Sequence, residues 1–291
     1  MTVNDIHRTA ELDPAMIKDL MVRLEGTVAD DVRLAAAADI ARRFDGHIVG
    51  LFLNILPPPL PADPDGAGVF QTTLLLQEAR AAGDTTMELL RARLNELDLP
   101  VEIRRFDVFS GEIPSVCARE ARSADVFVAL RPKSVPEEPE PIVENVLFGS
   151  GRHVLLVPPG AKDKMSFESV LIAWNGSREA ARALAESLPY LKLAPAVVVC
   201  VVDPLPAVEA QALLGTDAKH HLRHHGIAAV LHHVDGRKAD VGDALIAEAG
   251  RRRADLIVMG GYGHSRLRER LLGGVTYKLL HEAPIPLLLA H

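Results

Sequence analysis

The sequence is poor in aromatic residues and in long apolar runs, and each scarcity excludes a class of protein. Aromatics make up 4% of the 291 residues, so any core must be built from aliphatic side chains. No apolar run reaches the roughly 20 residues that a membrane helix needs. The first ten residues are polar and lack the apolar segment of a signal peptide. We therefore expect a cytoplasmic protein with no membrane partner.

Cysteine is equally scarce. Only Cys117 and Cys200 occur, and each lies in an apolar stretch. Cysteines in such surroundings are typical of buried free thiols rather than of a disulfide framework. This pattern predicts two free thiols in a reducing compartment.

The chain also lacks an excess of positive charge. It carries 32 Lys and Arg against 39 Asp and Glu, which gives a formal net charge of -7. Proteins that hold DNA or RNA through its phosphates need a basic surface. Nucleic acid is therefore not an expected partner.

What the chain does contain is an internal repeat. Asp19–Thr27 reads like Ser169–Ser177, at a spacing of 150 residues, and Ala124–Leu130 reads like Ala254–Gly260, at a spacing of 130. We predict two domains, residues 1–160 and 165–291. The short segment between them is rich in proline, glycine and charge, as linkers are.

Each half alternates β-branched apolar runs with stretches that place alanine and leucine at helical spacing. This alternation predicts an α/β fold: two tandem doubly wound, Rossmann-like parallel-sheet domains. In the first half we expect strands at 17–24, 48–53, 101–108, 126–130 and 154–157, and helices at 30–44, 72–97 and 113–122. Residues 57–68, rich in proline, are expected to form a loop.

The segment that carries chemistry runs from Val258 to Thr276, after an apolar strand and into a helix. Its glycines leave room for the backbone to approach a ligand, and amides at the start of the helix can point at phosphate oxygens. The segment predicts a phosphate cradle at the carboxyl end of a strand, where open α/β sheets bind ligands. Its spacing fits neither the Walker loop nor the dinucleotide fingerprint.

Glycine, two residues, glycine, nine residues and glycine, from Gly260 through Gly273, resembles the ATP loop of the universal stress proteins. The turn Trp174–Ser177 is similar to that family's first strand turn. The resemblance implies a stress-response or signalling module with ATP as its ligand, with or without Mg²⁺. Two residues depart from the family pattern: Gly274 stands at a serine or threonine position, and Asn175 at an aspartate position.

These segments meet at one edge of a parallel sheet, so we expect them to form one crevice. The phosphates would lie on the glycine amides, the ribose near Asn175, and the adenine against the second strand of this half. Arg266 is the one basic candidate near the glycines. The residues expected to contact the nucleotide are Asn175, Gly176, Val202, Gly260, Gly261, Gly263, Arg266, Gly273, Gly274, Val275 and Thr276.

The corresponding loop of the first half, Arg131–Pro141, is degenerate. It has no glycine and carries Glu137, Glu138 and Glu140, which would repel phosphate. The glycine-rich sequence Phe148–Gly151 resembles the end of the ATP motif, but the repeat places it after the last helix. We therefore expect one nucleotide per chain, in the second half only.

Other interpretations stay open at this point. The glycine-rich segment could simply shape a turn, and Asn175 and Ser177 could cap a helix. Histidines at 220, 221, 224 and 225 have a spacing that can hold zinc, but no third ligand stands near them, so we predict no metal site. Trp174 is expected in the core or in a pocket wall.

We find no nucleophile beside a base, no catalytic carboxylate pair and no redox cysteine pair, so the sequence does not indicate an enzyme. The alternatives to a nucleotide-binding module are a scaffold or dimerisation protein of the same fold, and a slow ATP hydrolase. The partners expected besides the nucleotide are an unidentified protein and a second copy of the chain. Within the chain, the halves should pair as a pseudo-dimer through strands 154–157 and 286–290, since exposed apolar edges aggregate.

Overall fold

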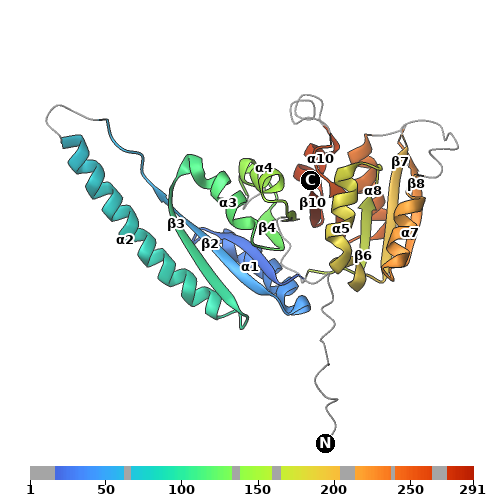
Figure 1. The fold of residues 1–291 in the computed structure, drawn as a ribbon, viewed down its shortest axis with the longest axis horizontal. Helices are drawn as coiled ribbons and strands as arrows, with labels where there is room; N and C mark the ends of the chain where they lie inside the picture. Colours follow the sequence, from blue (N-terminus) through green and yellow to red (C-terminus); the bar gives the residue numbers. More distant parts are fainter. Residues whose placement is uncertain are drawn as a thin grey trace, which may run out of the picture.

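The computed structural model describes residues 17–61, 67–132, 138–158, 165–203, 214–236, 240–263 and 274–291. In this part of the chain, ten strands form one continuous sheet flanked by helices (Figure 1). The strand order is β3-β2-β1-β4-β5-β10-β9-β6-β7-β8. Each half contributes five neighbouring strands in the same order, so the α/β doubly wound prediction is confirmed.

The first half matches the predicted elements closely. Its strands are β1 (Asp19–Leu24), β2 (His47–Leu56), β3 (Val101–Phe109), β4 (Val126–Leu130) and β5 (His153–Val157). Its helices are α1 (Ala29–Phe44), α2 (Ala67–Asn95), α3 (Ile113–Ala121) and α4 (Glu140–Gly149), with a short 3-10 turn η1 (Ser110–Glu112) before α3.

The second half repeats this arrangement. Its strands are β6 (Ser169–Ala173), β7 (Ala196–Asp203), β8 (Ala229–Asp235), β9 (Leu256–Gly260) and β10 (Leu287–Ala290). Its described helices are α5 (Arg178–Leu193), α7 (Thr216–His224), α8 (Val241–Arg252) and α10 (Val275–Glu282).

The two halves join through their last strands. β5 and β10 pair antiparallel, with Leu155 opposite Leu288, whereas every other neighbouring pair in the sheet is parallel. The predicted pseudo-dimer is therefore confirmed. Neither apolar strand is left as an edge, because each covers the other.

Helices cover both faces of the sheet, and this explains why its central strands are continuously apolar. Every residue of β4, β5 and β10 is buried. Two apolar clusters, one on each face, run across the joint: Leu155 and Leu288 belong to one, and Val154 and Leu289 to the other. The two halves thus share their cores.

Helix α2 differs from its prediction at the amino-terminal end. It begins at Ala67, five residues before the expected start, so the last two residues of the predicted loop are helical. Its carboxyl-terminal half packs through Met87, Leu90 and Leu94, but Phe70 is 67% exposed. The amino-terminal half of α2 buries little apolar surface, so it lacks the apolar face by which a helix is recognised in sequence.

Candidate functional site

A cavity of about 640 Å³ lies in the second half, at the carboxyl ends of β6, β7 and β9. Its volume falls within the range of pockets that hold small ligands. The amino-terminal ends of α5, α8 and α10 face it, which is the arrangement expected at the ligand edge of an open α/β sheet. The residues that line it are Ala173, Trp174, Asn175, Gly176, Ser177, Glu179, Ala180, Cys200, Val202, Val241, Leu245, Met259, Gly260, Gly263, Gly274, Val275 and Thr276.

The structure brings most of the predicted site residues together around this cavity. Eight of the eleven line it: Asn175, Gly176, Val202, Gly260, Gly263, Gly274, Val275 and Thr276. Arg266 and Gly273 lie outside the described residues. Gly261 is described but does not belong to the lining.

Gly261 faces the first half instead. Its N–H donates to the Ala290 carbonyl at 2.8 Å, so this amide already has a partner in β10 and is not free to bind phosphate. A β-carbon at Gly261 would lie 2.9 Å from Leu147 of α4. The glycine at this position thus serves the contact between the halves.

Gly260 has a packing role that the sequence did not reveal. A β-carbon here would lie 2.4 Å from the Glu179 carbonyl carbon and 2.5 Å from the Ala180 nitrogen. The first turn of α5 therefore crosses directly over the end of β9. Glycine at this position lets the helix approach closely enough to form one wall of the cavity.

The first turn of α5 is fixed by local capping. The Ser177 hydroxyl accepts the Ala180 N–H at 3.1 Å, and the Asn175 side-chain oxygen accepts the Ser177 N–H at 3.0 Å. Ser177 is thus the N-cap, as the alternative interpretation proposed, and Asn175 closes the turn before it. Both residues also line the cavity, so capping and ligand contact remain compatible.

The first turn of α10 forms the opposite wall. Its N-cap is Gly274, which supplies no side-chain oxygen to the helix start. The Thr276 hydroxyl accepts the Tyr262 N–H at 3.0 Å, which ties the backbone after β9 to the helix. Because the first amides of a helix have no partner within it, Gly274, Val275 and Thr276 present donors suited to an anion.

Glu179 is a site residue that the sequence did not reveal. Its side chain is buried against the cavity, and one carboxylate oxygen lies 3.3 Å from the position of a β-carbon on Gly263. The hydrogen bond from Arg178 lowers the pKa of this carboxyl, so it is ionised at neutral pH. An acidic residue in the first turn of a helix is common for its effect on the helix dipole, so the sequence held no distinctive signal.

The model of the universal stress protein family matches residues 166–291. The second half of the chain is thus similar to this family over its whole length. The match starts next to the predicted beginning of the second domain, and it contains every residue of the cavity lining. No curated protein sequence matches the chain significantly.

Solved structures extend the similarity in fold to the whole chain. A universal stress protein from Archaeoglobus fulgidus DSM 4304 is 16% identical, with 94% of this chain and 97% of that chain covered and a TM-score of 0.65. A functionally unknown protein from Pseudomonas aeruginosa PAO1 is 14% identical, with 94% and 92% covered and a TM-score of 0.59. A shorter match covers 43% of this chain and 96% of a universal stress protein in complex with cAMP, with 24% identity and a TM-score of 0.37.

Both cysteines of the chain are free and buried, as expected. Burial raises the pKa of each thiol to about 12. Cys117 lies on α3 in the first half, and Cys200 lies on β7, where it lines the cavity of the second. Neither thiol is ionised at neutral pH, so neither is a nucleophile in the folded protein.

Among the described residues of the second half, the histidines lie outside the cavity lining. On α7, His221 makes an edge contact with the ring of His225 just beyond the helix, with ring centroids 4.7 Å apart. On β8, the ring of His232 approaches the Glu248 carboxylate at 3.2 Å. In the described part of the chain, no group of three or more histidine, cysteine or acidic side chains is placed to hold a metal ion. Within the same residues, every helix is too short or too polar to cross a membrane.

Proposed function

We propose that the second half binds an adenine nucleotide in the cavity, and that the protein acts as a nucleotide-binding module in a stress response. The observation that carries the proposal is the meeting of three segments at one cavity: the turn after β6, the end of β7, and the first turn of α10. Each was expected from the sequence to contact a different part of the nucleotide.

Each part of the nucleotide has a suitable wall. Val202, with Val241 and Leu245, provides an apolar surface for the adenine ring. The Asn175 side chain lies at the turn after β6, within reach of a ribose hydroxyl. The free amides at the start of α10 would receive the phosphates, aided by the helix dipole.

Glu179 sets a condition on this proposal. An ionised carboxylate beside Gly263 repels a bare triphosphate, and the described lining holds no lysine or arginine to offset it. A divalent cation on the phosphates would convert this repulsion into attraction. We therefore expect ATP to bind more tightly with Mg²⁺ than without it.

Titration calorimetry with ATP, ADP, AMP and cAMP, each with and without Mg²⁺, tests the proposal. We expect one nucleotide per chain. Gly263→Val should abolish binding, because the valine side chain fills the space beside Glu179. Ser150→Ala, in the first half's lookalike sequence, is the matched control and should leave the affinity unchanged.

The second candidate function is a scaffold that binds no nucleotide. The position of Glu179 favours it, since the carboxylate stands where the family's phosphates are expected. Absence of heat with all four nucleotides would support the scaffold and reject the module. Loss of binding in Ser150→Ala but not in Gly263→Val would mean that the nucleotide binds in the first half. That result would also reject the proposed site.

A further inference from the structure

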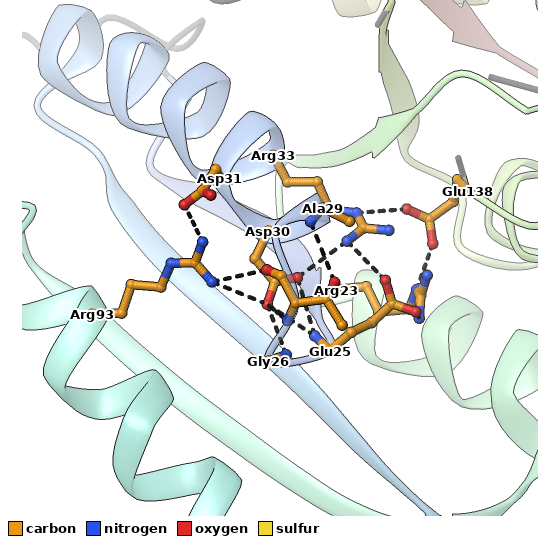
Figure 2. A network of polar contacts seen from close by, with 10 residues as sticks. Arg23, Glu25, Gly26, Ala29, Asp30, Asp31, Arg33, Arg93 and Glu138 are labelled. Carbon is orange, nitrogen blue, oxygen red and sulfur yellow. Dashed lines mark hydrogen bonds and ion pairs between the residues drawn. The ribbon is translucent and has the colours of Figure 1, made fainter. Parts of the chain in front are cut away.

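At the place in the first half that corresponds to the cavity of the second, charged side chains form a network of polar contacts (Figure 2). Arg23 extends from the end of β1, Arg33 from α1, and Glu138 from the segment just before α4. Arg33, Asp30 and Glu138 are fully buried, and Arg23 is 5% exposed. Buried charges are costly unless they are paired, so this group must be held together by its own contacts.

The Glu138 carboxylate lies between two guanidinium groups. One of its oxygens accepts from Arg23 Nε, and the other accepts from Arg33 Nε at 2.8 Å. A carboxylate or phosphate held by two arginines is a common arrangement for recognising an anionic ligand. Here the anion comes from the protein itself.

The place of Glu138 in the fold corresponds to the ligand side of the other half. It immediately precedes Pro139, the N-cap of α4, just as Gly273 precedes Gly274, the N-cap of α10. At the repeat spacing of 150 residues, Arg23 and Arg33 correspond to Ala173 and Ala183. Small residues in the second half thus stand where the first half carries two cations.

Two further carboxylates contact the guanidinium groups of Arg23 and Arg33. Glu25 pairs with both arginines, at 2.6 Å to Arg23 and 3.2 Å to Arg33, and Asp30 pairs with Arg33 at 3.1 Å. These two carboxylates match the two guanidinium charges, and Glu138 adds one negative charge. In the described part of the chain, Arg33 Nη2 has no hydrogen-bond partner, so the pair keeps a spare buried donor.

Besides its contact with Arg33, Asp30 closes the turn after β1. Its carboxylate accepts the backbone N–H groups of Glu25, Gly26 and Thr27, the nearest at 2.8 Å from Gly26. Arg93 of α2 approaches Asp30 at 3.7 Å and also pairs with Asp31 at the outer side of the cluster. The turn after β1 is thereby closed by a side chain rather than by a bound ligand.

We propose that Arg23 and Arg33 form an anion site of the class that takes a carboxylate or a phosphate group, and that Glu138 occupies it as a built-in ligand. The first half is thus held permanently in a ligand-bound arrangement. It requires no nucleotide to order the start of α4, whatever the second half binds.

Removing the built-in ligand tests this directly in the full chain. Glu138→Ala should lower the Tm by on the order of 10 °C, because it removes the carboxylate that bridges the Nε groups of two buried arginines. Formate, which is a carboxylate small enough to enter the space left, should restore much of the lost Tm as its concentration rises. Inorganic phosphate in a parallel titration shows whether the site also accepts that group.

Leu24→Ala is the matched control for instability alone. Leu24 is 1% exposed in the same half, so its truncation lowers the Tm by leaving a cavity and removes no charge. Formate should not restore it. An equal response of both variants to formate would show a general solvent effect and overturn the proposal.

Two further variants keep the test decisive if Glu138→Ala does not fold in plain buffer. Recovery of folding on adding formate would then be the expected result, and failure to recover would count against the site. Glu138→Gln fills the same space and should be insensitive to formate. Glu138→Ala combined with Arg33→Met should also lose the formate response, and a response that persists there would overturn the assignment of Arg33.

Discussion

The two halves of the chain have the same strand order but treat the same crevice in opposite ways. In the second half, small residues at 173 and 180 line a cavity of about 640 Å³, and Ala183 follows them on α5. In the first half, Arg23, Asp30 and Arg33 stand at the corresponding positions and fill the space with paired charges. The comparison teaches that one copy of a duplicated fold can fill with paired side chains the place that the other copy leaves open as a cavity.

The pairing of the halves is the feature whose loss should have the largest effect. Leu288 is fully buried in β10, opposite Leu155, and it packs in a core shared by both halves. Leu288→Asp buries an unpaired carboxylate there and should cost about 4 kcal/mol or more in free energy of unfolding. Chemical denaturation followed by circular dichroism measures this loss. Val230→Asp, on the 57% exposed side chain of edge strand β8, should change stability little, and equal losses would contradict the shared core.

The two halves also differ at the end of the fourth strand, where the first half has Leu130 and the second half has Gly260. Gly260→Ala forces a β-carbon against the α5 backbone and should destabilise the protein by about 2 kcal/mol while weakening any nucleotide binding. Gly250→Ala in α8 meets open space and should stabilise by about 0.5–1 kcal/mol. Thermal unfolding of both variants distinguishes a steric requirement from a general glycine effect, and stabilisation of both would remove the steric argument.

Charge in the open cavity can be altered without filling it. Glu179→Gln removes the carboxylate beside Gly263 and should tighten ATP binding by roughly 1 kcal/mol, about fivefold, in the absence of Mg²⁺. The gain should shrink when Mg²⁺ is present, because the cation already screens the carboxylate. Calorimetry at constant ionic strength measures both values, with the exposed Glu168→Gln as the control. Weaker binding in Glu179→Gln would mean that the carboxylate contacts the ligand favourably.

The smallest expected effect concerns the hydroxyl that the family pattern has at position 274. Gly274→Ser should tighten ATP binding by about one hydrogen bond, on the order of 1 kcal/mol. The backbone at Gly274 has φ -57° and ψ 158°, which a serine adopts without strain. Because serine is also a good N-cap, the Tm without ligand should be measured beside the affinity. A higher Tm with unchanged affinity would assign the hydroxyl to the helix and not to the nucleotide.

The central strands were predictable from the sequence because their residues are apolar on both faces. The joint was predictable because residues 154–157 and 287–290 are all apolar. The start of α2 was not, since Val69, Phe70 and Leu74 contribute no buried face to the pattern. The repeat and the glycines predicted which segments meet at the cavity. Gly261 shows the limit of that method: its amide bonds to a strand 29 residues further along the chain, which only the fold reveals.

The charged residues of both crevices mark the other limit. The acidic character of Arg131–Pro141 predicted repulsion of phosphate, but Glu138 is held by arginines that are 115 and 105 residues away in sequence. Glu179 was hidden for a different reason, since it stands where an ordinary helix start has an acidic residue. In both cases the role of a carboxylate depends on a backbone segment or cation that is distant in sequence but lies beside it in the fold.

The duplication also left one buried thiol in each half, and this gives each half its own chemical reporter. Cys117 and Cys200 are both fully buried with raised pKa values, so a thiol reagent can reach either only after local opening. The labelling rates of the two thiols, resolved by mass spectrometry of peptides, would compare how often each half opens locally within the same molecule. A ligand in the cavity should slow the modification of Cys200 but not that of Cys117. The rate at Cys117 then serves as the internal reference for how much of the cavity is occupied.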